Sequence, residues 1–475
     1  MAEFDLAVIG AGAAGLSVTA VAAQLGLRVA LIERGRMGGD CLNTGCVPGR
    51  ALLAAAHAAM DARGAGRFGL RIATPDIDWA AVRAHVHGVI AAIAPMDSVA
   101  RFTGLGATVL QGQAHFIGRD SLEIALPDGP RRLTARRIVI AAGSRAVPPP
   151  LPGLSGVAHV THETLFDLPG RPAHLLILGG GPIGLEMAQA HAGLGCRVTL
   201  IEAGRIAGGE DGELAGGLRA ALRRQGVALL EGVPVVRGEA GPALVLADGR
   251  RVEGSHLLVA AGRRPNIEDL GLEAGCVRAG PAGIATDAGL RSLTNRRVFA
   301  IGDIADPVGI GPRAFTHVGL YHAGIVIRRA VFRQRARIDY AALPRVIHTD
   351  PELAQVGLTE DEARAAGHDL RILRWPLAEN DRAQAERRPE GLVKLITTRR
   401  GRVLGAGILA PHAGEMIGLW TLAILQRTRL SVLAGMIVPY PTLAEAGKRA
   451  AGTFFMDRLF APATQRLARL LAWLP

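Results

Sequence analysis

The feature that most constrains the fold is an internal repeat. Residues 10–33, GAGAAGLSVTAVAAQLGLRVALIE, align without a gap with residues 179–202, GGGPIGLEMAQAHAGLGCRVTLIE, and 12 of the 24 aligned positions are identical. Each copy follows a short apolar run typical of a buried parallel strand, continues as an apolar helix pattern, and ends in a second strand that closes on glutamate. The repeat therefore predicts two βαβ units within an α/β fold.

Each copy also has the glycine spacing of a dinucleotide-binding turn. The glycines are Gly10, Gly12 and Gly15 in the first copy and Gly179, Gly181 and Gly184 in the second. The first two of each set leave room for a tight turn and for a pyrophosphate against the backbone, and the third lets the helix pack on the strands. Glu33 and Glu202, each 18 residues after the last glycine, are predicted to bind a ribose diol. The chain is therefore expected to bind two dinucleotides.

The second glutamate bears on the choice of nicotinamide cofactor. A carboxylate at Glu202 repels a 2′-phosphate, so NADH is expected there in preference to NADPH. Arg205 is close enough in sequence to weaken that repulsion.

Strands that end in a glycine turn, at 138–144 and 257–263, fit a protein with both a flavin and a nicotinamide site.

A pair of cysteines, Cys41 and Cys46, lies just beyond the first repeat, where ligands bind in a doubly wound fold. In a regular helix their Cα atoms would be roughly 8 to 9 Å apart, whereas a disulfide tolerates at most about 7 Å. A bond between them therefore requires a distorted segment, which Gly45 permits. Pro48 suits the first turn of a helix over 50–61, and Cys46 at its N-terminus would favour the thiolate. Taken alone, two nearby cysteines are as often structural as redox-active. Beside a flavin, the pair is expected to be redox-active.

Residues 38–48, GGDCLNTGCVP, resemble the active-site signature of the class I pyridine nucleotide-disulfide oxidoreductases, the family of dihydrolipoamide dehydrogenase, glutathione reductase and mercuric reductase. The similarity extends over essentially the whole chain. It includes both glycine fingerprints and the segments 262–266 (GRRPN), 301–303 (IGD) and 348–360 (HTDPELAQVGLTE). The resemblance implies two Rossmann-like domains, which bind FAD and NAD, and a C-terminal α+β dimerisation domain.

The resemblance also implies a relay of electrons. NAD(P)H would pass hydride to the flavin, Cys46 would be the thiol beside the flavin, and Cys41 would exchange with the substrate. Further cofactor contacts would come from a set of residues outside the glycine fingerprints. These are Gly39, Ala114, Gly143, Ser144, Asp303 and His317 for FAD and Gly262 for NAD. From the residues alone, Asp303 equally caps the end of a strand, and His317 equally caps a helix.

Two positions depart from the family pattern. Glu186 matches a glutamate that pairs with a lysine beside the flavin, but Arg50 stands where the lysine is usual. The disulfide reductases of the family also carry a His-Pro-x-x-x-x-Glu motif, which the second subunit contributes. Here the motif reads Tyr440-Pro-Thr-Leu-Ala-Glu445. A phenol is a poor proton acceptor at neutral pH, so ordinary dithiol exchange is expected to be slow.

A tyrosine at position 440 is similar to the arrangement in mercuric reductases, where a C-terminal tyrosine helps to hold the metal ion. No N-terminal cysteine pair and no adjacent C-terminal cysteine pair accompany it. A mercuric reductase-like acceptor is therefore the expected substrate, with dihydrolipoamide as the alternative. A further alternative is a flavin-bearing electron-transfer or binding subunit at a membrane, which would suit the amphipathic stretch 459–474. Asp381 and Arg382 either line the substrate approach or belong to a surface ion pair.

The expected architecture has four segments. Residues 1–150 begin an FAD domain, 151–270 form an NAD(P) domain, 271–344 return to complete the FAD domain, and 345–475 form the interface domain of a homodimer whose active site is shared between subunits.

Charge and composition exclude other classes. The chain has 475 residues and a formal net charge of +12, but its basic residues are scattered, so no nucleic-acid partner is expected. The uncharged stretch 6–27 follows acidic residues and is interrupted by glycines, which is typical of a buried βα unit rather than a signal peptide or a membrane span. No metal cofactor and no membrane partner are expected, and the exchangeable thiols favour a cytoplasmic location.

Overall fold

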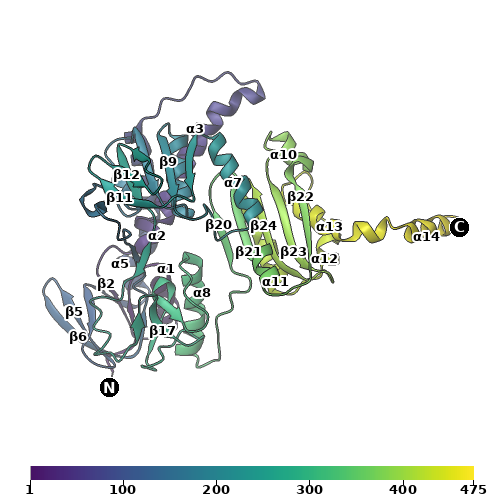
Figure 1. Ribbon diagram of the computed structural model, residues 1–475. Helices are drawn as coiled ribbons and strands as arrows, with labels where there is room; N and C mark the ends of the chain where they lie inside the picture. The colour runs from purple at the N-terminus through teal and green to yellow at the C-terminus, as the bar shows by residue number, and fades with distance from the viewer. Residues whose placement is uncertain (1, 475) are drawn as a thin grey trace.

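The first repeat forms the centre of a parallel sheet in the computed structural model, which describes residues 2–474 (Figure 1). β1 (Phe4–Ile9) lies between β2 (Val29–Glu33) and β6 (Gly129–Ile140), and α1 (Ala13–Gln24) connects β1 to β2. β18 (Val298–Ala300) pairs in parallel with β6, so a segment that follows the second repeat returns to the first sheet. Both faces of β1 are covered, which explains its nearly continuous apolar sequence.

Three of the other strands of this part extend the sheet, and the remaining elements surround it. The strands are β3 (Ala107–Gln111), β4 (Gln113–Phe116), β5 (Ser121–Leu126), β7 (Ser144–Ala146), β15 (Arg263–Pro265), β16 (Ala279–Gly280), β17 (Gly283–Thr286) and β19 (Ala305–Pro307). The helices are α2 (Gly39–Asn43), α3 (Cys46–Gly64), α4 (Trp79–Ile93), α5 (Val99–Gly104) and α8 (Thr316–Val326).

The second repeat builds a smaller parallel sheet in the order β10-β9-β8-β14. The strands of this sheet are β8 (His174–Leu178), β9 (Arg197–Glu202), β10 (Val227–Glu231) and β14 (His256–Val259), and its helices are α6 (Pro182–Gly193) and α7 (Gly212–Arg224). A separate antiparallel sheet of three strands is formed by β11 (Val235–Glu239), β12 (Ala243–Leu246) and β13 (Arg251–Glu253). Helix α3, which begins at Cys46, packs on α6 through small side chains, because an added Cβ at Gly193 would lie 3.1 Å from Ala56. The segment with the cysteines is thereby held between the two repeats.

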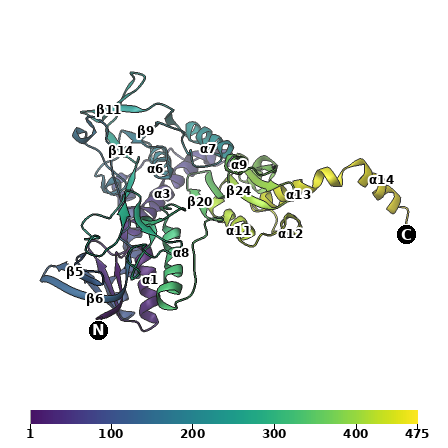
Figure 2. The same cartoon turned by 60° about the horizontal axis from the view of Figure 1, so that its bottom comes forward.

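The C-terminal part is a five-stranded antiparallel sheet in the order β20-β21-β24-β23-β22, covered by helices. Its elements are β20 (Pro344–Ile347), β21 (Glu352–Gly357), α9 (Glu360–Ala365), β22 (Leu370–Pro376), α10 (Asp381–Ala385), β23 (Leu392–Thr398), β24 (Val403–Ala410), α11 (Ala413–Leu425), α12 (Leu430–Gly435), α13 (Glu445–Leu459) and α14 (Pro462–Leu471). Successive side chains of β24 point to opposite faces of the sheet and pack in different hydrophobic cores. Leu409 packs in the core that contains α7, and Ile408 packs in the core that contains Trp420 of α11. Figures 1 and 2 show this part beside the two repeats, with α14 extending away from the body.

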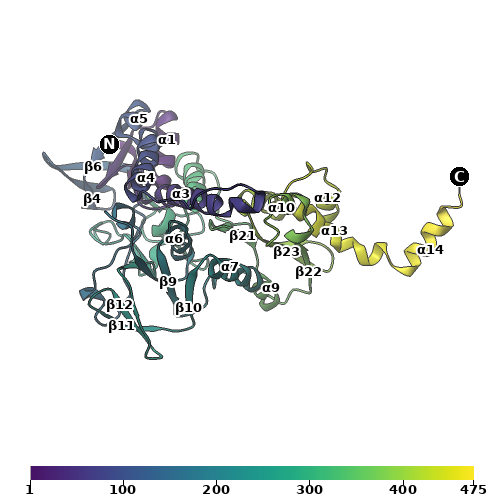
Figure 3. The same ribbon diagram turned by 90° about the horizontal axis from the view of Figure 1, so that it is seen from above.

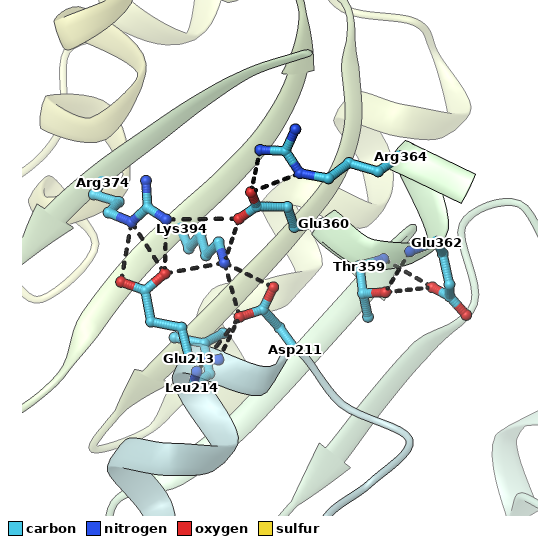
Figure 4. A network of polar contacts seen from close by, with 9 residues as sticks. All are labelled: Asp211, Glu213, Leu214, Thr359, Glu360, Glu362, Arg364, Arg374 and Lys394. Atoms are coloured by element: carbon cyan, nitrogen blue, oxygen red, sulfur yellow. Dashed lines mark hydrogen bonds and ion pairs between the residues drawn. The ribbon is translucent and has the colours of Figure 1, made fainter. Parts of the chain in front are cut away.

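A buried lysine joins the second repeat to the C-terminal sheet (Figure 4). The Nζ atom of Lys394, on β23, lies 2.9 Å from Asp211, 3.0 Å from Glu213 and 2.8 Å from Glu360. The Lys394 side chain is only 4% exposed. Burial by itself would lower the pKa of Lys394, but the hydrogen bonds that its ammonium donates to the three carboxylates outweigh it and raise the pKa. Arg374 and Arg364 complete the cluster and balance its charge.

Replacing Lys394 with methionine is expected to lower the free energy of unfolding by about 3–5 kcal/mol, because three carboxylates would be left together without their central cation. Urea denaturation at fixed protein and FAD concentrations measures the effect. Lys448→Met is the matched control, since no hydrogen bond or ion pair of Lys448 is found in the described chain, and it should stay within about 0.5 kcal/mol of the unaltered protein. Equal stability of the two variants would contradict a role for Lys394 in joining the two parts.

Candidate active site

The two glycine turns have the same backbone geometry. Gly10 has a φ of +104° and Gly179 a φ of +118°, and a Cβ at either position would overlap the carbonyl group of the strand beside it. The third glycine of each set, Gly15 or Gly184, packs directly on the carbonyl oxygen of the first. Each turn therefore has to be built from glycine for reasons within the chain.

The middle glycines differ, because the space beside them is open. An added Cβ at Gly181 would have nothing within 4 Å, and one at Gly12 would meet only the Cα of Gly39, at 3.9 Å. Gly12 and Gly181 are also the residues that directly precede α1 and α6, whose first N–H groups have no carbonyl partner within the helix. A pyrophosphate therefore fits at both turns.

The two acidic residues at the ends of β2 and β9 also occupy equivalent places. Glu33 accepts hydrogen bonds from the N–H groups of Ala11 at 2.6 Å and Gly35 at 2.7 Å. Glu202 accepts from Gly180 at 2.7 Å and Gly204 at 2.8 Å. These contacts fix each carboxylate beside its glycine turn, which is where a ribose would follow a bound pyrophosphate.

The segment with the cysteines is distorted at the predicted place. α2 ends at Asn43 and α3 begins at Cys46, so the helix is interrupted between Cys41 and Cys46, and Gly45 donates from its N–H to the carbonyl of Asp40 at 2.7 Å. The helix expected over 50–61 starts earlier, at Cys46 itself, so this residue does occupy a helix N-terminus. Both cysteines are free thiols in the structure, so the disulfide itself stays a proposal.

The two thiols differ in acidity. A hydrogen bond from the Cys41 thiol lowers the pKa of Cys46 to about 6, and the Thr316 hydroxyl, 3.3 Å from the Cys46 sulfur, and the charge of Arg50 act in the same direction. The same hydrogen bond to Cys46, together with burial, raises the pKa of Cys41. In the dithiol state Cys46 is therefore the thiolate and Cys41 the proton donor.

Alkylation of the reduced protein tests this difference. Because the pKa of Cys46 is lowered, its thiolate persists above about pH 6 and is lost as the pH falls below that value. Iodoacetamide labelling of Cys46, followed by peptide mass spectrometry, should therefore rise with a midpoint near pH 6, and Thr316→Val should move that midpoint upward. Labelling of the exposed Cys276 in the same samples should not respond to Thr316→Val. A midpoint unaffected by Thr316→Val would contradict the role of the hydroxyl.

Arg50 and Glu186 form the expected pair. The Nη2 atom of Arg50 lies 3.0 Å from both carboxylate oxygens of Glu186, which also accepts from the N–H of His348 at 2.9 Å. Arg50 Nη1 is buried and has no hydrogen-bond partner among the described residues. An acceptor on a group bound between the repeats would satisfy it, so the site fits a flavin despite the change from lysine.

A second polar network links the cysteine segment to the turn that follows β14. Arg263 donates to Asp40 at 2.7 Å and to the Ser144 hydroxyl at 2.9 Å, and that hydroxyl donates to Asp303 at 2.6 Å. Buried His162 lies 3.2 Å from Asp40 and 2.7 Å from Arg263. Hydrogen bonds from His162 and Thr44 and the charge of Arg263 outweigh burial and hold the pKa of Asp40 below its usual range. The Asp303 carboxylate thus accepts from a side chain, and no cap on a backbone N–H is seen for it.

Tyr440 has a different partner from the one that its motif suggests. Its hydroxyl donates to the Asp381 carboxylate at 2.5 Å, and this hydrogen bond raises the pKa of the phenol. Glu445 pairs instead with Arg449, at 2.9 Å. The alternative of a surface ion pair is found for Arg382, which pairs with Glu386, while Asp381 accepts from Tyr440.

Comparison with known proteins agrees with this geometry. Residues 4–326 match the family model described as pyridine nucleotide-disulphide oxidoreductase, and residues 343–451 match the dimerisation domain of the same family. The chain belongs to the pyridine nucleotide-disulphide oxidoreductase family. It is an oxidoreductase that uses FAD and NAD(P)H, and its dimerisation domain supports a homodimer.

Relatives with two different names align with nearly the whole chain. A mercuric reductase of Streptomyces lividans is 38% identical over 96% of this chain and 97% of its own length. A dihydrolipoyl dehydrogenase of Geobacillus stearothermophilus is 32% identical over 94% of this chain and 96% of its own. The Cu(II) complex of the HOCl-induced flavoprotein disulfide reductase RclA from Escherichia coli superposes with a TM-score of 0.85 and 27% identity, over 95% of this chain and all of that chain. These matches establish the family and leave the acceptor open.

The other predicted cofactor residues lie near the first glycine turn or on strands around it. A Cβ on Gly39 would collide with the Cα of Gly12, so Gly39 packs against the turn. Gly143 follows β6, and Gly262 precedes β15, which pairs with β7. Ala114 is buried in β4, which leaves only its main chain for a ligand. His317 does not cap α8, because its ring bonds to the carbonyl of Pro344, at 3.0 Å.

Sequence reasoning missed several residues that contact the site. These are Asp40, His162, Arg263, Thr316 and, as the partner of Tyr440, Asp381. Asp40 belongs to the cysteine motif at 38–48 and Arg263 to the motif at 262–266, so their positions in these motifs could have marked them as site residues. Thr316 and His162 belong to none of the sequence motifs, and only the tertiary fold brings Thr316 to Cys46 and His162 to Asp40.

Proposed function

We propose that the protein uses NADH to reduce a soft, thiol-reactive metal ion held by Cys41 and Cys46, with Hg²⁺ as the reference substrate. The observation that carries the proposal is the hydrogen bond from Tyr440 to Asp381, which keeps the phenol neutral where a disulfide reductase places an imidazole base. Soft cations prefer thiolates, and a hydroxyl oxygen can assist them without accepting a proton. The mercuric reductase relative supports the same class of acceptor.

Proton balance separates the two candidate reactions. NADH and Hg²⁺ give NAD⁺, Hg⁰ and H⁺, so a proton is released. NADH, H⁺ and a disulfide give NAD⁺ and a dithiol, so a proton is consumed and a residue beside the exchanging thiol has to deliver it. Tyr440, with its raised pKa, is a poor group for that task, whereas metal reduction does not require it.

The chain's own residues would each have one task. The open turns at Gly12 and Gly181 would hold the pyrophosphates, and Glu33 and Glu202 the riboses. FAD, when bound, would carry two electrons from the nicotinamide to the cysteine pair. Arg50, fixed by Glu186, would offer its free Nη1 to the flavin.

The cysteines would then bind the acceptor. Cys46, already a thiolate, would be the sulfur beside the flavin, and Cys41 would be the sulfur that the acceptor meets first. Tyr440 is 68% exposed and bonds to Asp381 rather than to either cysteine of its own chain. We therefore propose that it enters the active site of the second subunit, so that the site is shared across the dimer.

The structure supports NADH in preference to NADPH. The Glu202 carboxylate faces the backbone of its glycine turn, where it would meet a ribose and repel a 2′-phosphate. Arg205 lies with its guanidinium beside Gly212, at the start of α7, and is not paired with Glu202 in the described chain.

We also retain as proposals a cytoplasmic location and domain boundaries after residues 150, 270 and 344.

A substrate screen with proton counting tests the proposal. NADH oxidation is followed with Hg²⁺, Cu²⁺ and lipoamide, each supplied in chloride buffer without added thiol, while a pH-stat records protons. We expect Hg²⁺-dependent oxidation with one proton released per NADH, and turnover of lipoamide that is slower by about 10²-fold or more. Brisk lipoamide reduction with no response to Hg²⁺ would favour the dihydrolipoamide dehydrogenase alternative instead.

A further inference from the structure

The C-terminal helices leave the folded body as an exposed, amphipathic arm. The first half of α13 is packed on the interface domain, where Gly447 lies against Trp420, but its end at Leu459 is exposed. α14 contains no buried residue, and three views show it projecting away from every other element (Figures 1–3). We define the arm as residues 458–474. The model of the dimerisation domain ends before it, at residue 451.

One side of the arm is apolar. Leu467, Leu470 and Leu471 recur at helical spacing on α14, each more than half exposed. Phe460 precedes the helix, and Trp473, 89% exposed, follows it. A row of leucines bordered by aromatic residues is the composition of helices that lie in the plane of a membrane surface.

The other side of the arm is polar and exclusively basic in its charge. Arg458, Arg466 and Arg469 are its only charged residues, and the nearest acidic residue, Asp457, is already paired with Arg371. The basic charge of the arm indicates which partner binds its apolar side. An anionic lipid surface complements the three arginines, whereas the second subunit of the homodimer carries the same excess of positive charge as the arm's own chain.

We propose that the arm binds the protein to the surface of an anionic membrane, with its leucines between the headgroups and its arginines at the lipid phosphates. Every helix within residues 2–474 is too short or too polar to cross a bilayer, so the attachment is peripheral. The homodimer presents two arms, and two weak contacts on one surface bind much more tightly than one. The inference is independent of the acceptor that the active site reduces.

Flotation of the FAD-loaded dimer with lipid vesicles tests the proposal. The protein should float with vesicles of phosphatidylcholine and phosphatidylglycerol at low salt, and flotation should fall with pure phosphatidylcholine or with high salt. Replacing Arg466 and Arg469 together with glutamine should weaken the partitioning of each arm by about 30-fold, which is about fivefold for each arginine, and that of the two-armed dimer by more. Absence of flotation with the anionic vesicles would overturn the inference.

A matched pair of variants separates the apolar face from the basic one. Leu467→Ser with Leu470→Ser places two serines on the apolar side and should abolish flotation. Ala468→Ser with Ala472→Ser places them on the opposite side and should leave flotation unchanged. FAD content and NADH oxidation with ferricyanide confirm that each variant is folded, since the arm contacts none of the site residues.

Two further measurements test which partner covers the apolar side of the arm. The fluorescence of Trp473, obtained as the difference from Trp473→Phe, should shift to shorter wavelength on addition of anionic vesicles. If the unaltered protein does not float, and Leu467→Ser with Leu470→Ser instead converts the dimer to a monomer in size-exclusion chromatography, the arm packs on the second subunit and the membrane proposal is wrong.

Discussion

Cys46→Ser is expected to reduce acceptor-dependent NADH oxidation by a factor on the order of 10³ or more, because serine provides neither a thiolate beside the flavin nor a soft ligand for a metal ion. The same change should abolish the long-wavelength absorption band that anaerobic titration with NADH is expected to produce in the unaltered protein. Both effects follow from the lowered pKa of Cys46, which makes it the charged sulfur of the pair. Stopped-flow spectrophotometry and steady-state kinetics measure them.

Two other cysteine variants serve as controls for this result. Cys41→Ser should also stop acceptor reduction, but it should keep the long-wavelength band, since Cys46 remains and the serine hydroxyl can still donate to it. Cys276→Ser, at an exposed position away from the pair, should change neither property. A band that survives Cys46→Ser but disappears in Cys41→Ser would reverse our assignment of the two sulfurs.

Tyr440→His should raise lipoamide reduction by about 10²-fold, towards the lower end of what general acid–base catalysis contributes. The imidazole would be a usable base near neutral pH, and Asp381, which now accepts from the phenol, is placed to orient it. Reduction of Hg²⁺ should fall in the same variant, because the hydroxyl oxygen is lost. Initial rates with both acceptors at pH 7 give the comparison.

Tyr440→Phe separates the loss of the hydroxyl from the gain of a base. It should lower Hg²⁺ reduction as Tyr440→His does, without raising lipoamide reduction. If Tyr440→Phe accelerates lipoamide turnover as much as Tyr440→His, the tyrosine limits the reaction by obstruction and the proton argument fails. Rapid lipoamide turnover by the unaltered protein would count against the argument equally.

The fold class and both dinucleotide turns were predictable because their constraints are local. Gly10 and Gly15 are required by contacts with a neighbouring strand and with each other, so the requirement is visible as a spacing in the sequence. The interruption between Cys41 and Cys46 was predictable for the same reason, since five residues of helix cannot bring two sulfurs together. Repetition of the first pattern at positions 179–202 then fixed the number of such sites at two.

The composition of the active site was decided by tertiary structure. Asp40 meets Arg263 and His162, and Cys46 meets Thr316 of α8, so each contact joins residues that lie far apart in the sequence. The partner of Tyr440 was likewise set by packing, because Glu445 belongs to the same motif, whereas Asp381 is 59 residues away and is brought to the phenol by the position of α10. The sequence by itself determined which cofactors the chain uses, since a phosphate-binding turn needs only a few consecutive residues. Tertiary structure decided the state of the phenol, because Asp381 comes from a distant part of the chain. It also added the Thr316 hydroxyl to the neighbouring Cys41 and Arg50 in lowering the pKa of Cys46.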